Sequence, residues 1–455
     1  MIVAITGATG FVGTRLTAYL LAAGHEVVAL TRSPERAERE LPVRCRIVAW
    51  DPEHGRIDAG ALDGVDAAVN LAGVGVADGR WTARRKEAIR RSRVAATRLL
   101  VDAIAALPAE RRPRVFVSAS AIGFYGDRGD EILTEESAAG VGFLAEVCRA
   151  WEDAAIGAEA HGVRTVRLRI GVVLGREGGA LARMLAPFRL GLGGRIGSGD
   201  QWMSWIHVED LVALVAFALE RQDVRGVVNA VAPTPVTNAE LTATLGRVLE
   251  RPTILPVPSV ALRLALGEMG GVLLDGQRVL PATAEAHGFR FRHPELGGAL
   301  VDITADPATT LFHEQWVPRS PDEVFPFFGD AHNLERITPP FLKFRILHVS
   351  TPSLQNGTRI DYQLSLHGIP VRWQSLIRDW NPNRSFVDSQ TRGPYRRWDH
   401  THEFEPHRGG TILRDRVSYE LPLGAVGGLV AGGFVARDLA AIFAYRRATI
   451  REIFT

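Results

Sequence analysis

The sequence predicts two folds in succession: an α/β domain built on a doubly wound parallel sheet, and then a smaller α+β domain. Short apolar strands alternate with amphipathic helices from residue 2 to about residue 250, as in a parallel sheet covered on both faces. Segment 2–13, IVAITGATGFVG, places three glycines between the first strand and the first helix. After residue 308 the pattern becomes one strand, two short helices, a run of strands and a long helix.

Composition narrows the class of protein. The 455 residues are enough for two or three domains, and the 53 Lys and Arg nearly balance the 51 Asp and Glu, so no nucleic-acid partner is indicated. The two cysteines, Cys45 and Cys148, form neither a disulfide framework nor a metal site, and they fit a reducing cytoplasm. The start MIVAITG is expected to be a strand rather than a leader. Stretch 421–436 is apolar but glycine-rich and too short to span a membrane.

The glycines of segment 2–13 have separate physical roles. Gly7 can take the sharp turn out of the strand, Gly10 lets the backbone approach a pyrophosphate, and Gly13 lets the helix pack closely. The start of the helix offers free N–H groups and a positive dipole end to phosphates. A second apolar strand follows at 26–31, which favours a Rossmann-type dinucleotide site over a simple glycine-rich turn. The predicted cofactor contacts here are Gly7, Thr9, Gly10, Phe11, Val12 and Gly13.

The end of the second strand indicates which dinucleotide binds. An acidic residue at this position would hold the adenosine ribose of NAD, but the sequence has Arg32 between two hydroxyl residues. An arginine pairs with a 2′-phosphate that a carboxylate would repel, so NADP(H) is the predicted cofactor. The alternative is a solvated arginine at a strand end.

Two further strands, at 46–49 and 67–71, end in residues that are expected to face the same crevice. Asp51 is expected near the adenine, although it is alternatively a turn residue before Pro52. The end of the later strand is expected near the pyrophosphate or the ribose, through Asn70, Leu71, Ala72 and Gly73.

A long helical pattern at 81–107 carries a run of basic residues. A solvated outer face is the favoured interpretation, because the chain is nearly neutral and the same helix has an apolar face. The alternative is that some of these side chains line a site for an anionic substrate. The run comprises Arg84, Arg85, Lys86, Arg90, Arg91, Arg93 and Arg98.

The fifth strand, at 114–118, leads into SASAIGFYG, and at this point a family resemblance can be stated. GATGFVG, NLAG, SASAIGFYG and WIHVEDLV together resemble the extended short-chain dehydrogenase/reductase superfamily. More narrowly, they resemble its atypical epimerase-family group, whose members carry labels such as nucleoside-diphosphate-sugar epimerase. The resemblance covers residues 1 to about 300 and implies an NADP(H)-dependent oxidoreductase or epimerase acting on a small molecule. It does not specify the substrate.

The resemblance also implies site residues. Ser120 matches the residue that orients the substrate oxygen, and Ser118, Ile170 and Val172 fall where the family contacts the cofactor. The family's general acid/base is a tyrosine with a lysine four residues later. Here Phe143 and Val147 stand roughly at those positions, so neither a phenol nor an ammonium group is expected there to move a proton.

Three interpretations of this departure remain open. Tyr125 acts as the acid/base, or Glu146 or another group acts on a different substrate, or the domain binds NADP without turnover. Tyr125 has a structural alternative as a packing element, since a phenol with a pKa of about 10 is a poor base unaided. The two function classes are therefore an enzyme and a noncatalytic NADP-binding sensor or scaffold.

The predicted NADP-binding domain spans 1–250. His207, in WIHVEDLV, is expected to be a structural hydrogen-bonding residue at a strand-to-helix junction. Segment 251–303 contains several prolines among short helical patterns and resembles the small cap of the epimerase-like group. The substrate pocket is expected between cap and sheet, because pockets prefer such junctions.

The third predicted domain spans 308–455. Ser320 to Glu323 are expected to cap a helix, and the strands that follow show period-two alternation. The element order resembles the helix-grip domain of the START-like polyketide-cyclase (SRPBCC) superfamily. That resemblance implies a curved sheet around the last helix, expected from Arg437, and a cavity for an apolar ligand. The glycine-rich segment 421–433 is expected to be a flap over the cavity or an entry loop.

His400 and His402 lie two residues apart and share one face of a predicted strand. Two histidines so placed are compatible with a metal pair. No cysteine or third histidine has supporting spacing, so a solvated or hydrogen-bonded pair is favoured and no metal is predicted.

Overall fold

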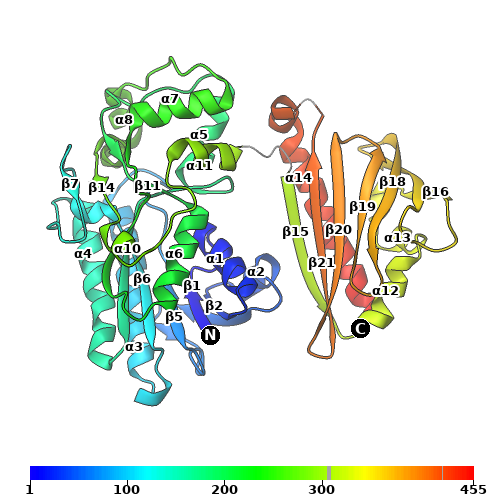
Figure 1. The fold of residues 1–455 in the computed structure, drawn as a ribbon, viewed down its shortest axis with the longest axis horizontal. Helices are drawn as coiled ribbons and strands as arrows, with labels where there is room; N and C mark the ends of the chain where they lie inside the picture. The colour runs from blue at the N-terminus through cyan, green and yellow to red at the C-terminus, as the bar shows by residue number, and fades with distance from the viewer. Residues whose placement is uncertain (305–308, 423) are drawn as a thin grey trace. The chain divides into compact units, whose positions relative to one another are not determined.

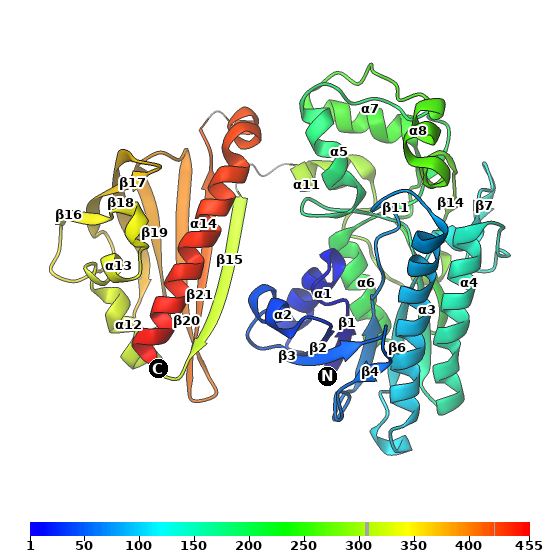
Figure 2. The ribbon, with the colours of Figure 1, turned by 180° about the vertical axis from the view of Figure 1, so that it is seen from behind.

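A computed structural model describes residues 1–304, 309–422 and 424–455, without the side chains of 309 and 424–433. The chain divides into two compact units, Met1–Ala305 and Asp306–Thr455, shown in Figures 1 and 2. Within the described residues, no helix is long and apolar enough to cross a membrane.

The first unit is built on an eight-stranded sheet whose strands are parallel except at one edge. Its first six parallel strands follow the chain order 3-2-1-4-5-6 of dinucleotide-binding folds, which confirms the predicted doubly wound architecture. The spatial order is β12 (Gly226–Ala230), β8 (Arg164–Ile170), β6 (Val115–Ala121), β5 (Ala67–Asn70), β1 (Ile2–Thr6), β2 (Glu26–Thr31), β3 (Arg46–Asp51) and β4 (Arg56–Ile57).

Helices cover both faces of this sheet because the strands are apolar on both sides. One face packs against α1 (Phe11–Ala22), α2 (Pro34–Glu40) and α6 (Val208–Glu220). The other packs against α3 (Ala83–Ala105) and α4 (Phe143–Ile156), which lie side by side in Figure 2, and against η3 (Gly157–His161). The order of strands places the ends of β1 and β5 at the point where the chain reverses direction across the sheet, and ligands bind there in this architecture.

A lobe of short elements completes the first unit. Its core joins α5 (Gly179–Arg189), α7 (Asn238–Leu249) and α11 (Leu296–Thr304). The remaining helices are η1 (Ala109–Arg111), η2 (Ile122–Tyr125), α8 (Ser259–Leu266), η4 (Gly267–Gly270), α9 (Gly271–Leu274) and α10 (Ala282–Ala286). Three strand pairs connect the lobe: β7 (Ile132–Leu133) with β14 (Arg278–Val279), β9 (Val172–Leu174) with β11 (Trp205–His207), and β10 (Trp202–Met203) with β13 (Val236–Thr237).

The second unit is an antiparallel sheet with one long helix against it, which confirms the predicted helix-grip class. The sheet order is β15 (Thr309–Val317), β21 (Gly410–Glu420), β20 (Arg397–His407), β19 (Ser385–Arg392), β18 (Ile369–Asn381), β17 (Arg359–Leu366) and β16 (Arg345–Val349). The short helices are α12 (Pro321–Gly329), α13 (Asn333–Arg336) and η5 (Pro340–Leu342). As predicted, the Glu323 carboxylate accepts the Ser320 backbone N–H at 2.9 Å at the start of α12.

The last helix begins earlier than predicted. Helix α14 runs from Gly424 to Phe454, so 424–433 is helical backbone rather than a flap or an entry loop. The glycines in this stretch each lower helix propensity by about 1 kcal/mol, which is why the sequence pattern indicated a later start. Residue 423, within the segment expected to be a flap, lies outside the described residues.

Candidate functional site

The ends of β1 and β5 are followed by two loops that the sequence predicts to face the same ligand crevice. Gly7 has a positive φ of 71°, and a side chain there would place its Cβ 2.9 Å from the backbone oxygen of Leu71. A residue other than glycine would therefore be strained in its backbone and would collide with the second loop. The sharp turn and the close approach of the two loops both require glycine at position 7.

The start of α1 lies directly against this turn. A Cβ at Gly13 would lie 2.1 Å from the backbone oxygen of Gly7, so only glycine allows the helix to pack so closely. Within the described part of the chain no side chain caps α1, and its first turn contains no acidic residue. The first N–H groups of α1 therefore remain available to an anion, and the helix dipole favours one there.

The side chains of Phe11 and Val12 pack within the protein. A Cβ at Gly178 would lie 2.5 Å from the Phe11 ring, so this ring packs on the loop that precedes α5, while Val12 packs on the sheet core. Any contact of these two residues with a dinucleotide would therefore be through the main chain. Thr9 is half-buried and Gly10 is exposed.

Asn70 is fully buried and fixes the second loop. Its amide oxygen accepts the Thr6 hydroxyl at 2.7 Å, and its amide nitrogen donates to Thr97 at 2.8 Å and to the buried Ser118 at 3.4 Å. The Thr6 hydroxyl oxygen in turn accepts the Ala72 N–H at 3.3 Å. The Asn70 side chain thus positions the loop through Gly73 and does not itself project into the crevice.

Arg32 and Asp51 are held by different partners at the edge of the sheet. Arg32 Nη1 lies 3.3 Å from Glu53 Oε1, and both side chains are about half exposed, so this ion pair contributes little to stability. Asp51 pairs with His54 at 2.6 Å and accepts the Glu53 N–H at 3.0 Å, and the His54 contact holds the pKa of Asp51 below its ordinary value. These contacts within the β3–β4 turn favour the turn alternative for Asp51.

Ser120 belongs to a buried polar network that crosses three strands. Ser120, Arg169 and Asn229 lie directly opposite one another on β6, β8 and β12. Ser120 Oγ donates to Glu152 Oε1 at 2.7 Å, and Arg169 donates to both oxygens of Glu152 at 2.8 and 3.0 Å. Because its proton is committed to Glu152, the Ser120 hydroxyl offers a further partner an acceptor rather than a donor. Sequence reasoning missed Glu152, although it lies one helical turn after buried Cys148.

Tyr125 is the next member of this network and is fully buried. Its hydroxyl donates to Asn229 Oδ1 at 2.7 Å and accepts from Arg169 Nη1 at 3.0 Å. Burial raises the pKa of the Tyr125 phenol above its ordinary value, which is opposite to what a general base at neutral pH needs. The geometry therefore favours the packing alternative for Tyr125 over the catalytic one.

The positions of Phe143 and Val147 supply no ammonium group, as expected, but one from another helix lies near Phe143. Helix α4 begins at Phe143, whose ring contacts Trp81 edge-to-face with centroids 5.1 Å apart. The Lys86 ammonium lies 5.3 Å from the Phe143 ring centroid and pairs with Glu268, whereas Val147 is buried. Lys86 comes from α3, so local motif comparison on α4 misses it. The sequence did contain a signal for this ammonium group. It has two lysines, Lys86 and Lys343, so Lys86 is one of only two side chains that could supply it.

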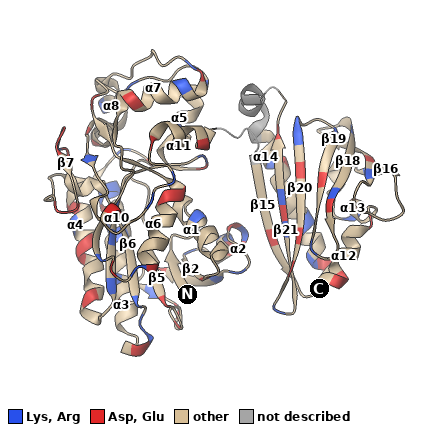
Figure 3. Cartoon of the chain, viewed as in Figure 1, with Lys and Arg blue, Asp and Glu red and all other residues tan. Residues whose placement is uncertain are grey.

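The basic run of α3 divides between two environments. Figure 3 shows basic and acidic residues interspersed along the elements of both units, as the balanced composition predicts. Arg85, Lys86 and Arg93 are half-buried, and Arg93 Nη1 donates to the backbone oxygen of Val74 at 3.0 Å. This half of the run therefore faces the loop after β5. These side chains are the ones that fit the alternative interpretation, in which part of the run lines a site for an anionic substrate. The solvated half comprises Arg84, Arg90, Arg91 and Arg98.

The residues expected near the nicotinamide end adjoin β11. Ile170 ends β8 and is half-buried. Val172 begins β9, and its N–H donates to the Ser204 backbone oxygen at 2.8 Å. His207 caps α6 by accepting the Glu209 N–H at 3.2 Å, which confirms its predicted place as a hydrogen-bonding residue at the strand-to-helix junction.

The histidine pair of the second unit has a buried carboxylate as its partner. Asp415 Oδ1 lies 2.8 Å from His400 Nε2 and 3.1 Å from His402 Nδ1. Arg446 Nη2 lies 3.3 Å from the same oxygen and 3.4 Å from His402 Nδ1. The pair is therefore hydrogen-bonded and lies beside a fixed cation. The sequence analysis did not identify Asp415 as a partner of the histidines. Asp415 lies between apolar residues on the buried face of β21, and this position is the signal that could have identified it.

The cavity beside His402 and Arg446 is small. A space of about 40 Å³ is lined mainly by apolar side chains, with Asp388, His402 and Arg446 at its polar part. Pockets for drug-sized ligands usually have about 300–1,000 Å³. An apolar ligand larger than a few atoms would therefore need the lining elements to move apart.

Comparisons with known proteins agree with both folds. The family model described as "NAD dependent epimerase/dehydratase family" matches residues 3–230. A model for a domain of unknown function matches 257–303, and one described as "Polyketide cyclase / dehydrase and lipid transport" matches 317–443.

Individual relatives are similar over about two thirds of the chain. An epimerase family protein of Mycobacterium bovis is 44% identical over 307 residues, which cover 67% of this chain and 98% of that protein. The crystal structure of human epimerase family protein SDR39U1 with NADPH is 38% identical, with a TM-score of 0.60, and covers 67% of this chain and 100% of that one. A nucleoside-diphosphate sugar epimerase from Corynebacterium glutamicum is 39% identical, with a TM-score of 0.53, and covers 67% of this chain and 58% of that one. The chain therefore belongs to the NAD dependent epimerase/dehydratase family.

Proposed function

We propose that the first unit binds NADP(H) and exchanges a hydride with a carbon of a small anionic substrate, as an oxidoreductase or epimerase. The observation that carries this proposal is the glycine cradle, in which the uncapped start of α1 lies against the Gly7 turn and the 70–73 loop. The human relative, which crystallised with NADPH, supports the choice of cofactor.

The proposed cofactor contacts follow the crevice. The main chain of 7–13 donates to the pyrophosphate, and the 70–73 loop, which Asn70 and Ser118 hold in place, lies beside it. Arg32 releases Glu53 and pairs with the 2′-phosphate, while Asp51 fixes the neighbouring turn. Ile170 and Val172 adjoin the nicotinamide end.

Ser120 is the proposed substrate-orienting residue, and Glu152 positions it. Because Ser120 Oγ donates to Glu152, it accepts a hydrogen bond from a substrate hydroxyl and aligns that alcohol for hydride transfer to the nicotinamide. As the hydride leaves, the hydroxyl proton would pass to Ser120 Oγ and the Ser120 proton to Glu152, and reduction would return the proton along the same path. The Lys86 ammonium would stabilise negative charge on the substrate. Lys86, with Arg85, would also attract an anionic substrate. Tyr125 has no catalytic part in this proposal.

Cofactor selectivity tests the binding part. Replacing Arg32→Asp should weaken NADPH about 10- to 100-fold, because a charge-assisted contact is lost and a carboxylate faces the 2′-phosphate. NADH should be little affected. Glu53→Gln is the matched control, because it removes the partner of Arg32 without removing Arg32. Titration calorimetry with both cofactors measures the effect, and equal losses for NADPH and NADH would contradict the assignment.

Measurements of catalytic turnover test the proposed hydride transfer and the role of Ser120. Absorbance of NADPH is followed with a panel of sugar nucleotides, ketones and enones. With any active substrate, Ser120→Ala should lower kcat about 100-fold and leave the affinity for NADPH unchanged, since a positioned group that moves or orients a proton contributes at about this scale. Unchanged kcat in Ser120→Ala would remove Ser120 from the mechanism.

A noncatalytic NADP-binding sensor or scaffold is the second candidate. The observations that favour it are the burial of Tyr125 and the replacement of the family's tyrosine and lysine by Phe143 and Val147. Tight NADPH binding with no absorbance change across the whole panel would support this candidate over the enzyme.

For the second unit we propose binding of an apolar ligand between α14 and the sheet, after the cavity opens. The family match to a polyketide cyclase and lipid transport model supports this proposal. Mass spectrometry of small molecules that co-purify with the full chain tests it. A reducing compartment such as the cytoplasm is the proposed location, since the sequence contains two cysteines, Cys45 and Cys148, and both are buried.

A further inference from the structure

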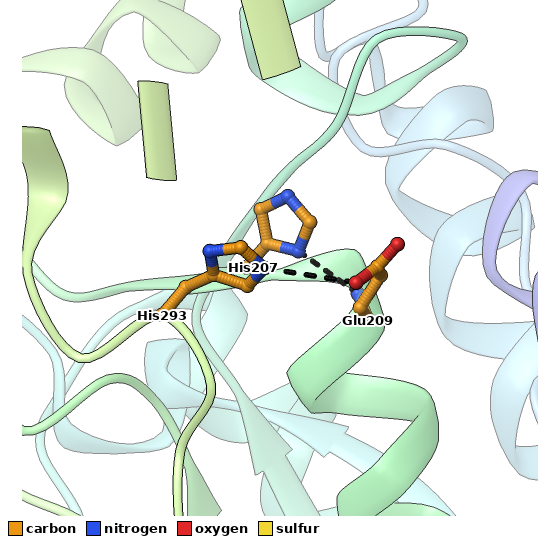
Figure 4. A group of neighbouring side chains, drawn as sticks. All are labelled: His207, Glu209 and His293. Carbon is orange, nitrogen blue, oxygen red and sulfur yellow. Dashed lines mark hydrogen bonds and ion pairs between the residues drawn. The ribbon is translucent and has the colours of Figure 1, made fainter. Parts of the chain in front are cut away.

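Two histidines and a glutamate come together in the first unit, apart from the residues proposed to bind cofactor and substrate. Figure 4 shows His207 from the end of β11, Glu209 from the first turn of α6, and His293 from the segment before α11. The imidazole centroids lie 4.0 Å apart. One nitrogen of each ring and one carboxylate oxygen of Glu209 all lie within 4.8 Å of one another.

Both histidines have a nitrogen that lacks a hydrogen bond. His207 is 2% exposed and His293 9% exposed, and within the described residues the Nε2 atom of each is buried without a hydrogen-bond partner. Buried polar atoms are normally satisfied, so two such nitrogens in contacting rings need an explanation. A carboxylate oxygen lies close to each without forming a hydrogen bond, since Asp302 Oδ2 is 3.4 Å from His207 Nε2 and Glu209 Oε2 is 3.6 Å from His293 Nε2.

The local charge favours a cation. Glu209, Asp210 and Asp302 surround the two rings, and Asp210 accepts the backbone N–H groups of Arg292 and His293 at 2.7 and 2.9 Å. This arrangement fixes the backbone that carries His293. The nearby positive side chain is Arg292, whose Nη1 lies 2.9 Å from Glu209 Oε2, but it is 73% exposed and can turn into solvent.

We propose that His207, His293 and Glu209, with Asp302 as a fourth ligand, form a binding site for a divalent transition-metal ion such as Zn²⁺. Two imidazole nitrogens and two carboxylate oxygens are a donor set typical of four-coordinate zinc. The exposed carboxylates of Glu209 and Asp302 can move the short distance needed to close around an ion. The ion would join the β11–α6 junction to α11, on which the cap segment ends.

Metal binding would change one specific hydrogen bond. In the metal-free chain His207 Nδ1 accepts the Glu209 N–H at 3.2 Å. When His207 binds a metal, Nδ1 either ligates the ion or carries the ring proton, so it no longer accepts that N–H. Metal binding should therefore increase hydrogen exchange at the Glu209 amide while protecting the segment around His293. A surface-bound ion would not produce this pair of changes.

The test uses the full chain, without a histidine tag and stripped with a chelator. Zn²⁺ is titrated in competition with a chromophoric chelator, and Co²⁺ is added separately to read the visible bands of tetrahedral coordination. The wild type should bind one equivalent, and Glu209→Gln should weaken binding about tenfold or more. Asp330→Asn is the matched control, because it alters an exposed histidine–carboxylate pair elsewhere and should change nothing.

Because Glu209 is half exposed, its substitution should leave the fold intact, and Asp302→Asn provides a second exposed variant with the same expected direction. Absence of tetrahedral Co²⁺ bands in the wild type would overturn the proposal. Equal Zn²⁺ affinity in the wild type, Glu209→Gln and Asp302→Asn would also overturn it. NADPH binding is measured in parallel, so that failure of this site is distinguished from failure of the proposed cofactor site.

Discussion

The two histidine–carboxylate clusters contain the same residue types in different arrangements. In the second unit His400, His402 and Arg446 all converge on one oxygen of Asp415, which lies among them in the interior. In the first unit His207 and His293 each face a separate, half-exposed carboxylate and, within the described residues, keep a nitrogen without a hydrogen bond. The cluster of the second unit ties both histidines to one buried carboxylate, although Arg446 Nε is itself buried without a hydrogen-bond partner within the described residues. The cluster of the first unit leaves histidine nitrogens for a ligand.

The position of the arginine is the decisive difference. Arg446 is 5% exposed and lies within 3.4 Å of both a histidine nitrogen and the carboxylate, so its charge occupies the place that a cation would take. Arg292 lies on the rim and is 73% exposed. Histidine and carboxylate spacing is therefore not enough to define a metal site, because a fixed neighbouring cation determines whether the donor atoms are free.

The largest expected effect is on the stability of the second cluster. Asp415→Asn should lower the free energy of unfolding of the second unit by about 3–5 kcal/mol, because it leaves the buried Arg446 charge without its partner. Glu209→Gln in the first cluster should change stability by less than about 0.5 kcal/mol, since that carboxylate is half exposed. Denaturant unfolding of both variants measures the contrast, and similar losses would show that the two clusters are energetically alike.

Removing the buried cation should make the clusters more similar. Arg446→Met keeps much of the side-chain volume and frees the Asp415 oxygen and His402 Nδ1. We expect this variant to bind a second equivalent of Co²⁺ or Zn²⁺, with an affinity at least about 100-fold above that of the wild-type second cluster, equivalent to about 2.7 kcal/mol. Circular dichroism establishes that the variant is folded. A folded variant without a second metal would show that Arg446 is not what excludes the ion.

Acid should destabilise the second unit through His402. Burial, with a smaller contribution from the charge of His400, lowers the pKa of His402 to about 3, whereas an unfolded histidine titrates at about 6.5. As pH falls below about 6.5 the unfolded chain takes up the proton first, so the free energy of unfolding declines until about pH 3. His402→Gln should flatten this part of the pH profile, and His332→Gln, which alters an exposed histidine, should not.

The smallest expected effect concerns the rim arginine of the first cluster. Arg292→Gln removes a cation that competes for Glu209, and exposed ion pairs are worth about 0.2–1 kcal/mol. Zn²⁺ affinity should therefore rise about two- to fivefold, as measured by chelator competition. Weaker binding in this variant would mean that Arg292 supports the site rather than competing for it.

Local pattern was sufficient for most of the fold. Apolar runs and glycine positions predicted β1, β2, β3, β5 and β6 of the first sheet, and they placed the turn at Gly7. The same reasoning began α14 too late, because glycine lowers helix propensity and tertiary packing can override that preference. The candidate site was predictable where backbone geometry matters, as at Gly13, and not where side chains from distant elements meet.

The sequence by itself determined the succession of strands and helices, the glycine spacing of segment 2–13 and the absence of the usual tyrosine and lysine, because each depends on residues close together in the chain. Only the tertiary structure decided which side chains meet. It placed Lys86 of α3 beside Phe143, joined Ser120 to Glu152, and set Arg446 against Asp415. Such contacts depend on how helices and strands far apart in sequence pack together. The periodicity of one element indicates which face is buried, but not which side chains of another element that face contacts.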